Sequence, residues 1–328
     1  MLLILLIAAG CGIFLLSLSI GRYRIPVGDA LGSILGLKDD VSPRVKTILF
    51  NVRLPRVWGA LLSGMALSCS GAAYQSLFRN PLASPDILGA ATGASFGTAL
   101  GILLDKGEPV TQVIAFCMGL AAVSLTAILS RAVGRNQSSI IPLVLSGLVV
   151  SGLFSAFISL VKYFADPENQ LPAITYWLMG GLSTVTREMV FTAAIIIVTG
   201  TVILNQLRWL LNLISFEEDE CRSMGVNLLA ARIFVIITAT LISSAAISLS
   251  GPVGWVCLFI PHMTRMLVGC NYRILLPVST LLGGIYLMLI DDLARNMARV
   301  EIPLGILTSL VGAPFFFLVL SRTERNKS

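Results

Sequence analysis

Long apolar segments separated by short polar ones run through nearly the whole 328-residue chain. The first, residues 2–20, would be about 28 Å long as a helix, which is enough to cross the hydrocarbon core of a bilayer. Further segments of this kind follow at residues 57–78, 87–104, 110–133, 140–161, 189–207, 229–249, 253–268, 274–294 and 303–321. The pattern predicts an all-α, polytopic membrane protein with about ten transmembrane helices in a single transmembrane domain, residues 1–328.

The composition supports a membrane protein and excludes several other classes. Charged residues make up 12% of the chain and the mean hydropathy is +0.89, whereas soluble domains carry about 25% charged residues. The net charge of +6 comes from Lys and Arg residues that lie singly between apolar blocks, so no nucleic-acid surface is predicted. The six cysteines lack CxxC spacing and there is one histidine. We therefore expect neither a metal site nor a cofactor.

The distribution of basic residues gives a predicted orientation. If the N-terminus is cytoplasmic, the inner loops hold 11 Lys and Arg residues and the outer loops hold 12, of which seven lie in the loop 21–56. Without that loop the count is 11 against five, which favours cytoplasmic N- and C-termini. The first outer loop is then unusually basic, and contact with an acidic partner is one explanation.

The stretch RNPLASPDILG predicts a sharp break between the second and third spans. Pro81 and Pro85 end the second helix, and Ser84 can cap the third helix, with Asp86 in its first turn. Small residues four apart, such as the glycines at 89, 93, 97 and 101, predict close packing of the neighbouring helices.

Two kinds of site that could power transport are not indicated by the sequence. No GxxxxGK[ST] phosphate-binding loop occurs, and the middles of nearly all the spans lack acidic and basic residues. Ion-driven transporters usually keep such a residue near the bilayer centre. Asp291 and Asp292 come closest, but an ion pair with Arg295 at i,i+4 is the simpler interpretation. A secondary transporter is therefore disfavoured, and a membrane scaffold that transports nothing remains an alternative.

The acidic segment SFEEDECRSMG is predicted to form a short capped helix at residues 216–224. Ser215 and Glu218 fit a capping box, Gly225 can stop the helix, and Asn227 can cap the next span. Under the predicted orientation this helix lies on the cytoplasmic face. A solvated loop helix is the simplest interpretation, but caps at both ends suit a rigid handle for a partner protein.

Several motifs together resemble the FecCD-type permeases, the transmembrane subunits of ABC importers for iron-siderophores, haem and cobalamin. The matching stretches are RLPR at 53–56, SGMALSCSGAAYQSLFRNPLASPDILGAATGA at 63–94, LMGG at 178–181, EEDECRSMGVN at 217–227, GPVGWVCLFIPHMTRMLVG at 251–269 and DDLARNMARVEIPLGILTSLVGAPFFFLVL at 291–320. The resemblance implies a type II ABC importer permease fold in the bacterial cytoplasmic membrane. It further implies no covalent chemistry in this chain, because ATP hydrolysis belongs to a separate subunit.

The resemblance also implies partners and sites. The expected partners are two ATP-binding cassette ATPase subunits, a second permease subunit in a homodimer or heterodimer, and an extracytoplasmic substrate-binding protein. Arg53, Arg56 and Arg295 match arginines that dock the binding protein. The segment at about 213–228 matches the cytoplasmic coupling helices, with Ser215, Phe216, Glu217, Glu218, Asp219, Glu220, Arg222, Met224 and Gly225 expected to contact the ATPase.

Two further sets of residues follow from the resemblance. The fifth span matches the helix that lines the translocation pathway, through Ser146, Gly147, Ser151, Gly152, Ser155 and Ser159. Family motif residues with a structural role are Asn80, Pro81, Ser84, Pro85, Pro261, His262 and Arg265. The predicted cargo is a small-molecule metal chelate, most often a ferric siderophore in this family, with haem, cobalamin and molybdate as alternatives.

Overall fold

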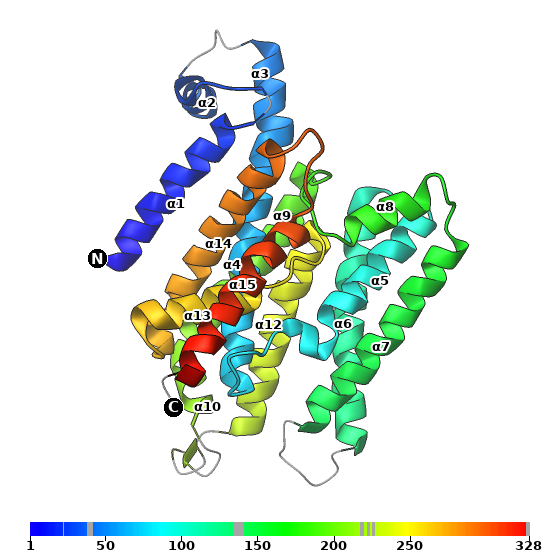
Figure 1. Ribbon diagram of the computed structural model, residues 1–328, viewed down its shortest axis with the longest axis vertical. Helices are drawn as coiled ribbons and strands as arrows, with labels where there is room; N and C mark the ends of the chain where they lie inside the picture. The colour runs from blue at the N-terminus through cyan, green and yellow to red at the C-terminus, as the bar shows by residue number, and fades with distance from the viewer. Residues whose placement is uncertain are drawn as a thin grey trace.

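The computed structural model describes residues 1–21, 23–37, 42–133, 141–216, 220–221, 224 and 227–325, and these residues form helices and connections without a strand (Figure 1). A helix lies at each predicted span: α1 (Leu2–Ser19), α4 (Leu54–Leu77), α5 (Ala90–Leu103), α6 (Glu108–Val133), α7 (Ile141–Phe164), α9 (Arg187–Gln206), α12 (Leu228–Ser250), α13 (Val256–Val268), α14 (Tyr272–Asn296) and α15 (Leu304–Arg325). Six are long and apolar enough to cross a membrane, and three more are shorter apolar helices. The predicted all-α polytopic fold is confirmed.

Short helices mark the two ends of the bundle. They are α2 (Val27–Ile34), α3 (Pro43–Thr47), α8 (Gln170–Trp177) and α10 (Arg208–Ile214). Figure 1 shows α2, α3 and α8 at its upper end, hereafter the α2 end, and α10 at its lower end, hereafter the α10 end. A π-helical turn, η1 (Ile48–Arg53), leads from α3 directly into α4. Only one residue, Leu207, separates α10 from α9.

The predicted break after α4 is present but longer than expected. Asn80 accepts a hydrogen bond from the Leu82 amide at 2.9 Å, and Pro81 follows it directly. Ser84 is the N-cap residue and Pro85 the first residue of a 3₁₀ turn, η2 (Pro85–Leu88), yet the Ser84 side chain makes no capping bond. Gly89 then takes a left-handed φ of 83° before α5 starts. Asp86 therefore belongs to this turn. The expectation that it lies in the first turn of the spanning helix is wrong.

Close helix contacts at small residues hold the bundle together. A Cβ atom added to Gly64 of α4 would lie 2.2 Å from the Gly283 carbonyl oxygen of α14. On α5, a Cβ at Gly93 or Gly97 would lie 2.5 or 2.7 Å from backbone atoms of α6. Backbones this close gain van der Waals contact, which larger side chains at these interface positions would prevent. The glycine spacing thus predicted a packed seam correctly, although Gly89 lies outside the helix.

We expect Gly64→Ala to lower the stability of the purified protein by about 1–3 kcal/mol, because the new methyl group meets rigid backbone. Gly12→Ala in α1 is the matched control, since nothing lies within 4 Å of its added Cβ. Thermal unfolding of both variants in the same detergent measures the difference. Equal melting temperatures for the two variants would contradict this account of the seam.

Candidate transport site

A carboxylate lies inside the bundle, on the α10 side of its middle. Asp86 in η2 lines a cavity of about 60 Å³ together with Leu67, near the middle of α4, and Cys257, at the start of α13. The Asp86 side chain is exposed to this opening in the isolated chain. Within the described residues its carboxylate makes no hydrogen bond or ion pair. An ionisable group inside a membrane protein is energetically costly, so its presence indicates a functional site.

The cavity forms where two interrupted helices meet. Between α12 and α13 the chain leaves helical geometry at Gly251, with φ 66°, and at Trp255, with φ 69°. A tryptophan at positive φ is strained by about 1–3 kcal/mol, and such strain concentrates at functional sites. The contact is tight, because a Cβ at Gly71 of α4 would lie 2.1 Å from the Cys257 carbonyl oxygen. Broken helices that meet at membrane depth are typical of transport sites.

The predicted pathway residues of α7 divide into two groups. Ser146 and Gly147 are buried, and a Cβ at Gly147 would lie 1.9 Å from the Ile87 carbonyl oxygen, so this face packs on η2. Ser151 lies against Gly89 on the same side. Gly152, Ser155 and Ser159 are exposed in the isolated chain. In this structure only these last three could line an open pathway, while the first three fix η2 on α7.

At the α2 end, the predicted docking arginines are part of an ion network inside the chain. Arg56 of α4 binds Asp291 of α14 through Nε at 3.0 Å and Nη2 at 2.9 Å. Its Nη1 lies 2.9 Å from both oxygens of Glu301. Arg56 is 7% exposed and Asp291 1%. These bonds tie α4, α14 and the segment after α14 together.

Arg295 joins the same network from α14. Its Nε lies 3.1 Å from Asp291, the i,i+4 pair expected from the sequence, and Nη2 binds Asp292. Asp292 also accepts a hydrogen bond from the Ser17 hydroxyl of α1 at 2.6 Å, and Arg295 donates to the Ser17 carbonyl at 3.3 Å. The network therefore anchors α1, whose middle is otherwise weakly packed.

Arg53, the third docking candidate, pairs with carbonyls instead of carboxylates. Its guanidinium donates to the backbone oxygens of Leu18 and Tyr23, and the residue is 5% exposed. Burial and the like charge of Arg295 lower the Arg53 pKa, which Asp292 partly offsets. A guanidinium still stays protonated at neutral pH. The three arginines are balanced by Asp291, Asp292 and Glu301, so this cluster has no net charge and its docking role stays a prediction.

The predicted coupling segment, at the α10 end, is described in part. Glu217, Glu218, Asp219, Arg222 and Gly225 lie outside the described residues. Ser215 ends α10, and its hydroxyl donates to the Asn212 carbonyl at 2.6 Å. Glu220 and Cys221 are helical, and Cys221 is buried. Phe216 and Met224 are 46% and 55% exposed, which leaves two apolar side chains at this end available to a partner.

Both sides of that segment are anchored to the bundle. Asn227 caps α12 by accepting from the Ala230 amide at 3.1 Å, as the sequence predicted. On the other side, the Ser76 hydroxyl at the end of α4 donates to the Leu211 carbonyl of α10 at 2.6 Å. The side chain of Asn212 accepts from the Tyr272 amide at 2.8 Å. Helix α10, which the sequence analysis missed, thus joins the coupling segment to α4 and α14.

The remaining motif residues lie in α13, where they support the fold. Pro261 is inside the helix, and the ring of His262 lies 6.0 Å from that of Phe316 in α15. Arg265 donates to the Tyr272 hydroxyl at 3.1 Å. In the part of the chain the structure describes, no group of three or more His, Cys, Asp or Glu side chains could hold a metal ion.

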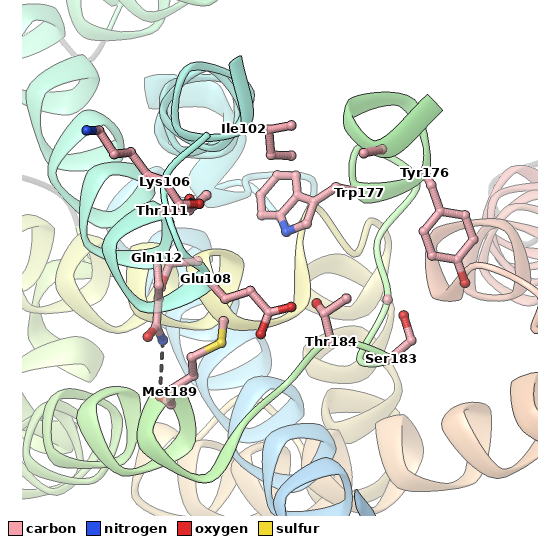
Figure 2. A pocket seen from close by; sticks show the side chains of 13 residues that line it. Ile102, Lys106, Glu108, Thr111, Gln112, Tyr176, Trp177, Ser183, Thr184 and Met189 are labelled. Atoms are coloured by element: carbon pink, nitrogen blue, oxygen red, sulfur yellow. Dashed lines mark hydrogen bonds between the residues drawn. The ribbon is translucent and has the colours of Figure 1, made fainter. Parts of the chain in front are cut away.

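A second cavity, of about 260 Å³, lies between the start of α6, the end of α8 and the segment leading to α9. Figure 2 shows the Glu108 carboxylate directed toward Thr184, with the Trp177 indole beside them. Gln112 closes one wall by donating to the Met189 carbonyl at 3.1 Å. Neither Glu108 nor Trp177 has a side-chain partner among the described residues. The cavity thus offers unpaired polar groups at the α2 end.

Sequence reasoning missed Asp86 and this second cavity for different reasons. From the sequence, we interpreted Asp86 as a residue at the start of the third span, at the membrane edge. Only its position between Pro85 and Gly89 indicated that the break between the second and third spans is longer. The structure instead places Asp86 inside the bundle, in a turn between two spanning helices. The cavity is built from segments far apart in the chain, so no local pattern could have indicated it.

Comparisons with known proteins agree with this architecture. The FecCD transport family matches residues 4–322. The chain is 38% identical over 313 residues to the molybdate import system permease protein MolB of Haemophilus influenzae, covering 94% of this chain and 92% of that protein. It is 37% identical to a probable iron chelatin transport system permease of Helicobacter pylori strain 26695, covering 84% and 83%.

A solved structure has the same fold over its full length. An inward-facing ABC transporter of the metal-chelate type superposes with a TM-score of 0.88 at 36% identity, covering 98% of each chain. These matches lead to one conclusion. The chain belongs to the FecCD transport family of ABC transporter permeases.

Proposed function

We propose that this chain is the membrane subunit of an ATP-driven importer that passes ferric siderophores from an external binding protein to the cytoplasm. The subunit works as a dimer, either with a copy of itself or with a sister permease, above two ATPase subunits. The α10 end faces the cytoplasm and the α2 end faces the binding protein. The excess of basic residues in the loops on the α10 side, once the first loop is set aside, supports this orientation.

The ATPase contact is the segment after α10. Its exposed Phe216 and Met224 supply apolar anchors beside the acidic residues, and interfaces gain most from such buried anchors. Because α10 is bonded to α4 and α14, a push on this segment reaches both spanning helices. Closure of the ATPases then shifts the dimer between two arrangements of its helices.

Binding-protein docking at the α2 end requires exchange of partners. Arg56 and Arg295 already bind carboxylates of their own chain. A glutamate of the binding protein would take the place of the half-exposed Glu301, whose side chain is 29% exposed, more easily than that of Asp291. Arg56 is suited to this exchange, because a guanidinium can bind two carboxylates at once.

Asp86 is the observation that carries the cargo assignment. Its unpaired carboxylate lies inside the bundle where broken helices meet, and cargo passing there would experience its charge. At about 6 Å and an effective dielectric constant of about 20, one negative charge repels another by about 3 kcal/mol. A dianionic oxyanion such as molybdate is repelled twice as strongly, whereas a neutral metal chelate is not. Asp86 thus favours an uncharged ferric siderophore over molybdate. Cobalamin and haem are further chelates of this class, although the two propionates of haem would also be repelled.

The same residue favours a second candidate function, ion-coupled secondary transport. Such transporters bind their coupling ion at a carboxylate near the bilayer centre. Reconstituted vesicles with a sodium or proton gradient but no ATP separate the two functions. Uptake driven by the gradient alone would support the second candidate, and uptake that requires ATP would support the importer.

We expect the double variant Phe216→Ala, Met224→Ala to weaken binding of the ATPase subunit roughly 5- to 30-fold, as loss of about 1–2 kcal/mol of anchor contact implies. ATP-driven uptake should fall in parallel. Leu104→Ala is the control, because Leu104 is 52% exposed near the α2 end. Unchanged ATPase affinity in the double variant, measured in detergent, would argue against this coupling surface.

Glu301→Gln tests docking without disrupting the rest of the ion network, because Arg56 still forms its ion pair with Asp291. If Arg56 docks the binding protein, removal of the competing carboxylate should tighten docking about two- to fivefold at low salt. Glu168→Gln, next to α8 at the same end, controls for a general loss of negative charge. Surface plasmon resonance measures both variants. If Glu301→Gln leaves docking unchanged or weakens it, the proposed docking role of Arg56 is contradicted, and its bonds serve only to hold the chain together.

For the cargo, we expect reconstituted importer with its binding protein to carry a radioactive ferric siderophore and to exclude radioactive molybdate. Asp86→Asn should retain iron uptake and raise molybdate entry about tenfold or more, because the repulsion is removed. Asp86→Glu keeps the charge and should behave like the unsubstituted protein. Molybdate uptake by the unsubstituted importer at the rate of iron uptake would overturn the siderophore assignment.

A further inference from the structure

An apolar groove runs between α6 and α12 on the surface of the bundle. Its volume is about 430 Å³, and its walls include Val123 and Ala127 of α6 and Ile236, Ile237 and Leu241 of α12. Ser124 and Thr240 are polar lining residues, but the Thr240 hydroxyl is 2.7 Å from that of Tyr74 and is therefore occupied. The groove offers an almost wholly apolar surface.

The groove lies away from the candidate transport site. On another side of α6, the Thr126 hydroxyl donates to the Leu88 carbonyl of η2 at 3.0 Å, and Thr126 is fully buried. Groove residues Ile128 and Ile237 are instead 63% and 54% exposed. Apolar side chains that are exposed on a membrane-spanning surface face lipid.

One end of the groove carries a positive charge. Arg131, in the last turn of α6 at the α10 end, lines the groove and is exposed. No carboxylate of the described residues pairs with it. The helix from Leu120 to Arg131 rises about 16 Å, which matches the roughly 15 Å of one leaflet's hydrocarbon. An acyl chain in the groove would therefore place its headgroup beside the guanidinium.

A second groove provides an internal comparison. Between α1, α4 and α14, a cavity of about 360 Å³ is lined by residues such as Ile7, Phe14, Trp58 and Ile285, and no charged residue lines it. This groove can hold an acyl chain but has no group that would select a headgroup. The α6–α12 groove differs by Arg131, and guanidinium groups bind phosphate oxygens in a fork geometry.

We propose that the α6–α12 groove is a binding site for an anionic phospholipid of the leaflet at the α10 end. One acyl chain lies along Val123, Ala127 and Ile237, and the headgroup phosphate binds Arg131. The site selects phosphatidylglycerol over phosphatidylcholine because the net charge of the headgroup adds to the apolar contact. Bound lipid bridges α6 and α12 and stabilises their contact.

Native mass spectrometry of the purified protein, given equal amounts of phosphatidylglycerol and phosphatidylcholine, tests this site. We expect phosphatidylglycerol to be retained roughly fivefold more often, as about one additional cationic contact implies, and Arg131→Gln to remove most of that preference. Arg273→Gln is the matched control, since Arg273 is exposed at the start of α14 at the same end, outside the groove. The control should keep the preference.

A second variant tests the acyl chain separately from the headgroup. Ala127→Phe fills the groove and should lower retention of both lipids, with Arg131 intact. Thermal unfolding in lipid-free detergent confirms that each variant is folded. Equal retention of the two lipids by the unsubstituted protein, or the same loss in Arg273→Gln as in Arg131→Gln, would overturn the proposal.

Discussion

Inside a bilayer every backbone and charged group must find its partner within the protein, because lipid provides none. This constraint decides where the chain can leave helical geometry. At the break near Cys257, the Cys257 carbonyl accepts from Gln75 Nε2 at 3.3 Å, and the Leu88 carbonyl accepts from Thr126 at 3.0 Å. Side chains of neighbouring helices thus replace the lost helical bonds. Asp86, which lines the candidate transport site, has no such partner among the described residues and is the exception.

The ion network shows the same constraint at the edge of the bundle. Arginines at 5–7% exposure would be costly as unpaired charges, and removal of one partner from a buried pair costs about 3–5 kcal/mol. Here Asp291 is shared by Arg56 and Arg295, so α4 and α14 are bonded through one carboxylate. The docking role that we propose for these arginines would therefore add to a structural role that they already have. Of the three carboxylates, only Glu301 lies at the exposed side of the network. It can leave Arg56 without becoming a buried, unpaired charge.

The sequence predicted the fold well because its signals are local. Apolar runs gave the spans, Asn227 gave a helix cap, and the spacing of Asp291 and Arg295 gave an ion pair. The features that the sequence could not predict depend on how distant segments pack together in the folded chain. The depth of Asp86 follows from how far the segment after α4 re-enters the bundle. The burial of Arg56 follows from Asp291 and Glu301, which lie more than 230 residues further along the chain.

Helix α4 connects the three regions of the molecule. Arg56 near its start belongs to the ion network, Gly71 touches the break at Cys257, and Ser76 near its end holds α10. Its 24 residues span about 36 Å as one uninterrupted helix. A rigid rod cannot move at the α10 end without a response at Gly71 or Arg56, since both contacts are too tight to slide. Under the proposed coupling, force applied beside α10 would therefore reach the break at Asp86 through α4. Helix α7 would move together with this break, because its Gly147 packs as tightly on Ile87 of η2.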